Sequence, residues 1–163
     1  MTSFMKTLAL GGLLALAAGG ASAAVKVTYV QPENFPDMPF ATWERDEILQ
    51  QLTEHFDKLG KALPPGQDLR IEVLDFDPAG RLLPNRAAGR DLRVLTGQAD
   101  WPRMKLRYTV EQNGQVLKSG EAQLSDMNYQ SGPHRYFDSE PLRYEKEMID
   151  EWFEKAIAPL PRR

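Results

Sequence analysis

The sequence predicts an α+β fold, a two-layer sandwich in which two main helices pack beside a mostly antiparallel sheet of 4–5 strands. Two long segments repeat apolar residues at spacings of three and four, and several shorter segments alternate apolar with polar residues. The segments follow one another in the order β-α-β-(β)-β-β-α. No internal repeat or low-complexity linker interrupts residues 24–163, which are therefore expected to form a single domain.

The first two elements are a strand and a helix. Residues 25–30 alternate, which predicts a strand. Thr42 is expected to cap the helix that follows, because its hydroxyl can accept a hydrogen bond from an unpaired N–H group of the first turn. Pro64 and Pro65 stop this helix. Its buried face is marked by apolar residues three and four apart: Ile48, Leu52, Phe56, Leu59 and Leu63.

A second strand is predicted at residues 69–77. Leu69, Ile71 and Val73 share one face, but Phe76 falls on the other, so the strand is either buried on both sides or bent near Val73. Residues 78–90 contain glycines and a proline and are expected to form a loop or a short helix. Residues 91–96 could form a short strand.

The clearest β signal is a hairpin over residues 103–125, with its turn near Asn113-Gly114. A two-residue turn would place Glu121 opposite Leu106 on the apolar face. A three-residue loop with Gly114 left-handed avoids this, so we expect the three-residue loop. Its register gives the pairs Val110–Val116, Leu106–Gly120 and Met104–Ala122.

The chain ends with a polar, aromatic loop over residues 126–138 and a helix over about residues 141–158. Pro159 and Pro161 end the helix. Its apolar face is expected to consist of Tyr144, Met148, Ile149, Trp152, Phe153 and Ala156.

Residues 1–23 have the three-part plan of a secretory signal peptide. Lys6 precedes an unbroken run of Leu, Ala and Gly, and Ala21-Ser22-Ala23 supplies the small residues that signal peptidase reads. The run is about half of the roughly twenty residues that a membrane span needs. We therefore expect cleavage before Ala24 and a mature chain without a membrane span. The segment is of bacterial type, so the expected location is the periplasm, with secretion from the cell as the alternative.

The composition argues against several classes of function. The formal net charge is −3, whereas nucleic-acid binding needs concentrated positive charge. The absence of cysteine excludes thiol catalysis and thiolate metal sites. His55 and His134 belong to no metal-binding spacing motif, and no serine lies in a nucleophile elbow. We therefore expect no metal and no cofactor.

Two polar segments at expected strand ends are candidate sites. The stretch Asp75-Phe76-Asp77-Pro78-Ala79-Gly80 resembles the start of a calcium loop, but its later positions lack the required ligands, which favours a turn. The arginines at 81, 86, 90 and 93 could bind an anionic partner, although a solvated loop is favoured. We expect one ligand-binding surface to be lined by residues of these segments and of the 126–138 loop: Asp75, Asp77, Arg81, Asp126, Tyr129 and His134.

Several landmarks resemble those of a bacterial family of exported proteins, domain-of-unknown-function family 3016. They cover nearly all of the chain after residue 24: Val25-Lys26-Val27-Thr28-Tyr29, Asp75 to Arg81, Arg93-Val94, Trp101-Pro102, Asp126 to Tyr129, and Tyr144 to Met148 with Trp152-Phe153. The resemblance implies a single exported domain. It supplies no activity and no catalytic residue.

Three functions are compatible with these observations. Export together with the lack of a recognisable catalytic set favours a non-enzymatic protein that binds an envelope protein or an anionic ligand. The first alternative is a small hydrolase that uses a carboxylate pair with His134, and it requires a pocket holding Asp75 or Asp77 together with Asp126 and His134. The second is a structural or stress-related envelope protein without a discrete ligand.

Overall fold

The computed structural model describes residues 23–85, 89 and 91–157, and it confirms the α+β class. Its main sheet has the strand order β1-β2-β5-β6, with β1 parallel to β2 and the other neighbours antiparallel. A separate two-stranded ribbon pairs β3 with β4. The elements are β1 (Val25–Tyr29), the 3-10 helix η1 (Pro32–Asn34), α1 (Thr42–Gly60), β2 (Gln67–Asp77), β3 (Arg81–Leu83), β4 (Leu92–Val94), β5 (Arg103–Gln112), β6 (Gln115–Ser125) and α2 (Arg143–Ala156). The predicted signal peptide lies outside the described residues, apart from its last position.

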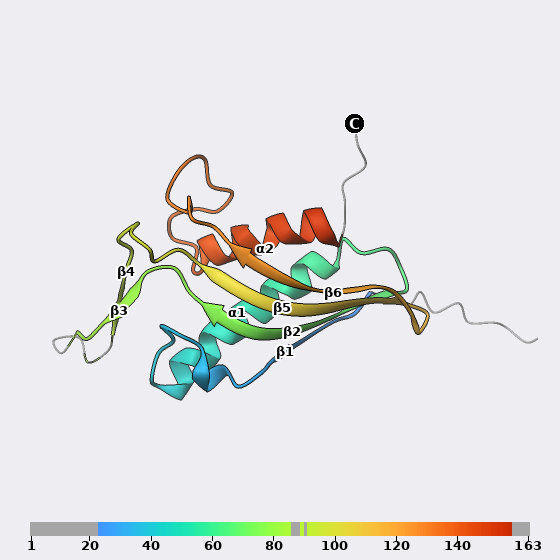
Figure 1. Ribbon diagram of the computed structural model, residues 1–163, viewed down its shortest axis with the longest axis horizontal. Helices are drawn as coiled ribbons and strands as arrows, with labels where there is room; N and C mark the ends of the chain where they lie inside the picture. The colour runs from blue at the N-terminus through green and yellow to red at the C-terminus, as the bar shows by residue number, and fades with distance from the viewer. Residues whose placement is uncertain (1–22, 86–88, 90, 158–163) are drawn as a thin grey trace, which may run out of the picture.

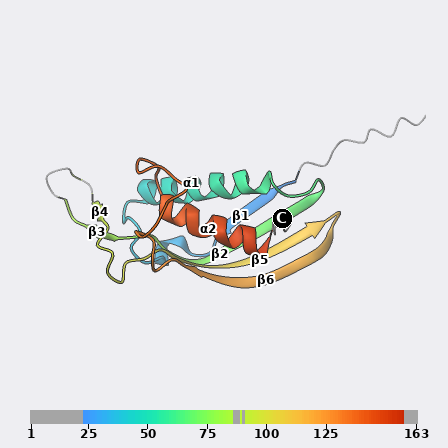
Figure 2. The same cartoon turned by 90° about the horizontal axis from the view of Figure 1, so that it is seen from above.

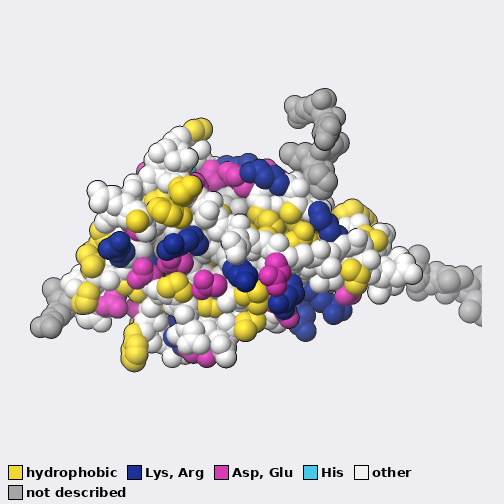
Figure 3. Space-filling view, in the orientation of Figure 1, with side chains coloured by type: hydrophobic (Ala, Val, Ile, Leu, Met, Phe, Trp, Pro, Cys, Tyr) yellow, Lys and Arg dark blue, Asp and Glu magenta, His cyan; other side chains and the backbone are white. Residues whose placement is uncertain are grey.

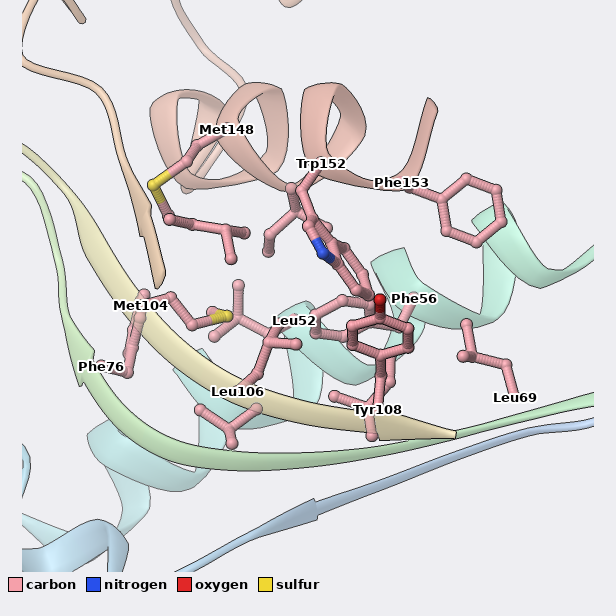
Figure 4. Packing of buried hydrophobic residues seen from close by; sticks show 14 of the residues in the cluster. Leu52, Phe56, Leu69, Phe76, Met104, Leu106, Tyr108, Met148, Trp152 and Phe153 are labelled. Carbon is pink, nitrogen blue, oxygen red and sulfur yellow. The ribbon is translucent and has the colours of Figure 1, made fainter. Parts of the chain in front are cut away.

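Both helices pack on the same face of the sheet, as Figures 1 and 2 show. Alternation along β5 sends every second side chain to that face, where Leu106 is fully buried. Figure 4 shows Leu52 and Phe56 of α1 and Trp152 of α2 meeting this row. The apolar residues that repeat along the helices and along the strands therefore pack together in one core.

The strand β2 bends where the sequence changes its apolar face. The pairing with β5 shifts between Val73 and Asp75, which leaves Leu74 as the extra residue of a β-bulge. The bulge lets Val73 and Phe76 both point into the core, although they lie an odd number of residues apart. The sequence left two alternatives for this strand, burial on both sides or a bend near Val73, and the bulge shows the bend.

The predicted hairpin exists, but its predicted register is wrong. The turn is a two-residue Asn113-Gly114 turn, and a bulge at Leu117 then moves the pairing by one residue. The observed pairs are Val110–Lys118, Tyr108–Gly120, Leu106–Ala122 and Met104–Leu124. The bulge keeps Glu121 off the apolar face and places Gly120 opposite Tyr108. An added Cβ at Gly120 would lie 3.1 Å from the Tyr108 hydroxyl oxygen and 3.2 Å from two carbons of its ring. Neither register considered from the sequence included a bulge.

Two local predictions also need correction. The N-cap of α1 is Ala41, which makes no side-chain hydrogen bond, and Thr42 is already helical. Residues 81–83, expected in a loop or short helix, form β3, which pairs with β4; Gly80 just before it, with φ +83°, allows the backbone to lie close to Val94. Arg86 and Arg90 of the predicted arginine cluster lie outside the described residues.

A buried polar network ties α1 to α2 and to the loop after β6. Nε2 of His55 lies 2.7 Å from Oδ1 of Asp150, and the Tyr136 hydroxyl donates to Oδ2 of Asp150 at 2.6 Å. A carboxylate only accepts hydrogen bonds, so Nε2 of His55 carries the proton. His55 is therefore a packed histidine with a defined partner.

The other face of the sheet is open and charged. Arg107 contacts Glu72 on β2 and Glu121 on β6, and Arg70 contacts Glu111. Figure 3 shows the resulting mixture of basic and acidic side chains over the strands. Within the described residues, no helix is long and apolar enough to cross a membrane.

Candidate functional site

The end of β2 and the start of β3 hold three of the six predicted site residues, in different surroundings. Asp75 is exposed on the open face of the sheet, and Arg81 is exposed at the start of β3. Asp77 is buried and bonds to Nε and Nη2 of Arg103. Burial raises the pKa of Asp77 more than Arg103 lowers it. Asp77 therefore anchors a strand end, while Asp75 stays available to solvent.

The other three predicted residues lie in the loop after β6. Asp126 accepts the backbone N–H of Asn128 at 2.9 Å, which is an Asx turn. The Tyr129 hydroxyl is buried and donates to Oδ1 of Asp100 at 2.9 Å. His134 lies partly buried, with Nδ1 3.0 Å from Oε2 of Glu147. Each of the three side chains has a local partner.

Asp100 explains the buried position of Tyr129. Its Oδ2 accepts both the N–H and the hydroxyl of Thr96 at 2.7 Å, and its backbone carbonyl accepts the N–H of Gly80 at 2.8 Å. Desolvation by burial raises the pKa of the Asp100 carboxyl, but the hydrogen bonds that it accepts from Thr96 and from Tyr129 outweigh this and lower the pKa. Through these hydrogen bonds, Asp100 joins the turn after β2, the segment after β4 and the loop after β6.

Another buried acid, Glu145, lies in the first turn of α2. Its Oε1 accepts the N–H of Ala79 at 2.7 Å, while Arg93 donates to the Ala79 carbonyl at 3.1 Å and to the Asp37 carbonyl at 2.7 Å. Arg93 and Glu145 also line a pocket of about 250 Å³. Their bonds to the backbone show that they hold the turn after β2 against α2. Sequence reasoning missed Glu145 because it assigned only apolar residues to the buried face.

Burial also makes Glu145 a source of pH-dependent stability. Desolvation raises the pKa of this carboxyl above 4.5, despite the opposing hydrogen bond and the nearby Arg93. A raised pKa in the folded state favours the protonated form, so the stabilising contribution is complete below about pH 4.5 and is lost as pH rises through the raised value.

Glu145→Gln should therefore flatten the pH dependence of stability. Glutamine keeps an acceptor for Ala79 but carries no charge, so the variant should gain stability relative to the natural protein at pH 8 and not at pH 4. Urea unfolding at the two pH values measures this difference. An equal shift at both values would contradict the assignment.

An open groove lies on the charged face of the sheet and has a volume of about 390 Å³, against about 250 Å³ for the pocket beside Arg93 and Glu145. We call it the Trp101 groove. The Arg103 guanidinium lies 5.6 Å from the Trp101 ring centroid, in cation–π contact. Lys105 contributes a second cation, 3.9 Å from Glu121, and Met127 is 69% exposed. The complete lining is Asp75, Trp101, Arg103, Met104, Lys105, Gln123, Leu124, Ser125 and Met127.

A second pocket lies between the last part of β6 and α2 and has a volume of about 260 Å³; we call it the α2 pocket. Leu124, Met148 and Trp152 give it an apolar wall, and Glu151 and Lys155 add charges. The Trp152 indole N–H is buried and has no hydrogen-bond partner among the described residues. Asp126 belongs to this pocket, whereas Asp75 belongs to the Trp101 groove.

The six predicted residues are thus not gathered into one of the three pockets. Neither the Trp101 groove nor the α2 pocket contains His134, and no two of the predicted carboxylates share either one. Within the described residues, no group of three or more His, Asp or Glu side chains is placed to hold a metal ion. The signal for the Trp101 groove was present in the sequence, as Arg103 and Lys105 on the polar side of a strand that follows Trp101.

Comparisons with known proteins give a family and a distant structural likeness. A comparison with curated proteins gives no match. Among solved structures, the chain is similar to protein XCC0632 from Xanthomonas campestris, itself assigned to family DUF330. The identity is 11%, 85% of each chain is covered and the TM-score is 0.37. The model of the family described as "protein of unknown function (DUF3016)" matches residues 23–155, so this chain belongs to the DUF3016 family.

Proposed function

We propose that this protein is exported to the periplasm and acts there as a non-enzymatic binding protein, with an envelope protein as the partner that presents an acidic group to the Trp101 groove. The observation that carries the proposal is the groove itself. It combines an aromatic ring, an exposed methionine and two cations in one open depression. Such a lining suits a partner with both an apolar and an anionic part.

The two cations differ in what they can offer. Arg103 already uses Nε and Nη2 on Asp77, so it is held in place, and its Nη1 has no partner among the described residues. Lys105 is held only loosely and can turn towards an incoming carboxylate. The pair therefore resembles a fixed donor beside an adjustable one. Asp75 at the margin disfavours a partner with high negative charge at every position.

Export is tested by mass spectrometry of the protein expressed from its full-length gene. The expected product begins at Ala24 and is found in the periplasmic fraction. A product that keeps residues 1–23 and stays in the cytoplasm would contradict the location.

The groove is tested by Lys105→Gln. Removing one charged donor should lower partner binding roughly tenfold, since a hydrogen bond to a charged group contributes about 1.5–3 kcal/mol. The measurement is quantitative capture from crosslinked envelope fractions. The matched control is Lys26→Gln, which removes a lysine from the exposed side of β1. Equal capture by both variants and the natural protein would refute the role of the groove.

A further inference from the structure

The main sheet has two edge strands, β1 and β6, and β6 is the lowest strand in Figure 2. In antiparallel pairs, residues whose N–H and C=O groups point to the neighbour alternate with residues whose groups point away. The N–H of Asp126 donates to the Pro102 carbonyl at 3.3 Å, which fixes the phase of this alternation. Leu124 and Ala122 therefore bond to β5, whereas the backbone groups of Glu121, Gln123 and Ser125 point to the open edge.

The two pockets lie on opposite sides of this edge. Gln123, Leu124 and Ser125 line both the Trp101 groove and the α2 pocket. A strand sends successive side chains to opposite faces of its sheet. A segment paired with β6 would therefore place alternate side chains in the groove and in the α2 pocket, while its backbone bonded to the outward groups.

We propose that the partner of this protein binds by adding an extended peptide strand to β6, with acidic side chains towards the Trp101 groove and apolar side chains towards the α2 pocket. This inference rests on the proposed function and specifies its partner. The positive charges of Arg103 and Lys105 favour acidic side chains on one face of the peptide strand. The apolar wall of the α2 pocket, formed by Leu124, Met148 and Trp152, favours apolar side chains on its other face. The buried, unpartnered indole N–H of Trp152 is a further donor on that side.

The rest of β6 favours a short peptide over a second copy of this chain. The bulge at Leu117 breaks the regular edge, and Lys118 bonds to the Ala156 carbonyl at the end of α2. Regular outward pairing next to the pockets is thus limited to residues 121–125. A β6 strand from another copy would bring Gln123 and Ser125, which are uncharged, and Glu121, whose carboxylate already pairs with Arg107 of its own chain.

The test is amide hydrogen exchange followed by NMR, with a capped eight-residue peptide of alternating Glu and Leu as the probe. Binding should slow the exchange of the Gln123 and Ser125 amides at least tenfold and should shift the Trp101 indole signal. A peptide of the same composition with its Glu and Leu residues in two blocks, and one of alternating Lys and Leu, should do neither. Methylating the backbone nitrogens that face β6 should abolish binding, and methylating the alternate set should not.

Two results would overturn strand addition. A shift at Trp101 and Lys105 without slower exchange at Gln123 and Ser125 would leave the groove as a binding site but would refute pairing with β6. Protection of these amides in the free protein that disappears on dilution would identify a second copy as the occupant. Loss of the Lys105→Gln effect in envelope capture would instead refute the proposed function, so the two failures are distinguishable.

A proline variant tests the edge from the protein side. Gln123→Pro removes one outward N–H without breaking the ladder to β5 and should lower peptide affinity at least tenfold. Ser119→Pro is the matched control, because its N–H also points outwards but it lines neither pocket. Circular dichroism checks that both variants fold. Unchanged affinity in a folded Gln123→Pro variant would refute the proposal, and the methylated peptides decide the question if that variant does not fold.

Discussion

Asp150→Ala should lower the free energy of unfolding by about 2–6 kcal/mol, because it leaves two hydrogen-bond donors without their acceptor and each such loss costs about 1–3 kcal/mol. Asp150 accepts hydrogen bonds from His55 on α1 and from Tyr136 in the loop after β6. His55 would lose its acceptor in a part of the protein closed to water, since the side chains of His55 and Asp150 are only 5% and 10% exposed, and the partly buried Tyr136 would lose its acceptor as well. Urea unfolding monitored by circular dichroism measures the effect.

The control for this variant is Asp138→Ala. Asp138 also bonds to a basic side chain, Arg143, but it is 96% exposed, so its removal should change stability by less than about 1 kcal/mol. If Asp150→Ala were as mild as Asp138→Ala, the network would not be what joins the two helices to the loop.

Gly80→Ala should cost about 3 kcal/mol or more. Gly80 has φ +83°, and an added Cβ would lie 2.6 Å from the backbone carbonyl oxygen of Val94. The left-handed conformation alone costs about 1–2 kcal/mol for a residue with a Cβ, and a clash with backbone cannot be relieved by turning a side chain. The substitution would push apart the turn after β2 and the ribbon of β3 and β4.

Gly114→Ala separates the cost of the left-handed conformation from the cost of the clash with backbone. Gly114 has nearly the same φ, +81°, but an added Cβ would meet nothing within 4 Å. It should therefore show only the conformational cost, about 1–2 kcal/mol. Equal losses for the two variants in urea unfolding would show that the approach of Val94 contributes nothing.

The elements that the sequence predicts well are those in which the apolar pattern continues over many residues. Apolar residues on α1, β5 and α2 repeat over several turns or pleats, and each repeat selects the same buried face. The predicted hairpin register failed for two reasons: the turn has two residues and not three, and the bulge at Leu117 then moves every later pair by one more residue, without leaving a signal in the alternation on either side of it.

The buried acids were not predictable from the same patterns. A periodic pattern locates one buried face, but the N-terminal half of α2 is covered on further sides, by the turn after β2 and by the loop before the helix. Asp150 therefore lies inside although it falls off the apolar stripe, whereas Glu145 lies on the stripe, three and four residues before Met148 and Ile149, and was passed over because its side chain is charged. The Trp101 groove depends on residues from β2, β5, β6 and the following loop, which only the tertiary structure brings together.

The most direct test of the binding account is site-specific photocrosslinking in the living cell envelope. A photoreactive amino acid replaces Met127 in the groove, and in the control it replaces Lys26 on the exposed side of β1. The account predicts a discrete crosslinked product from position 127 that is absent from position 26 and is reduced by Lys105→Gln. Identical crosslinking from both positions, or none from position 127, would contradict it.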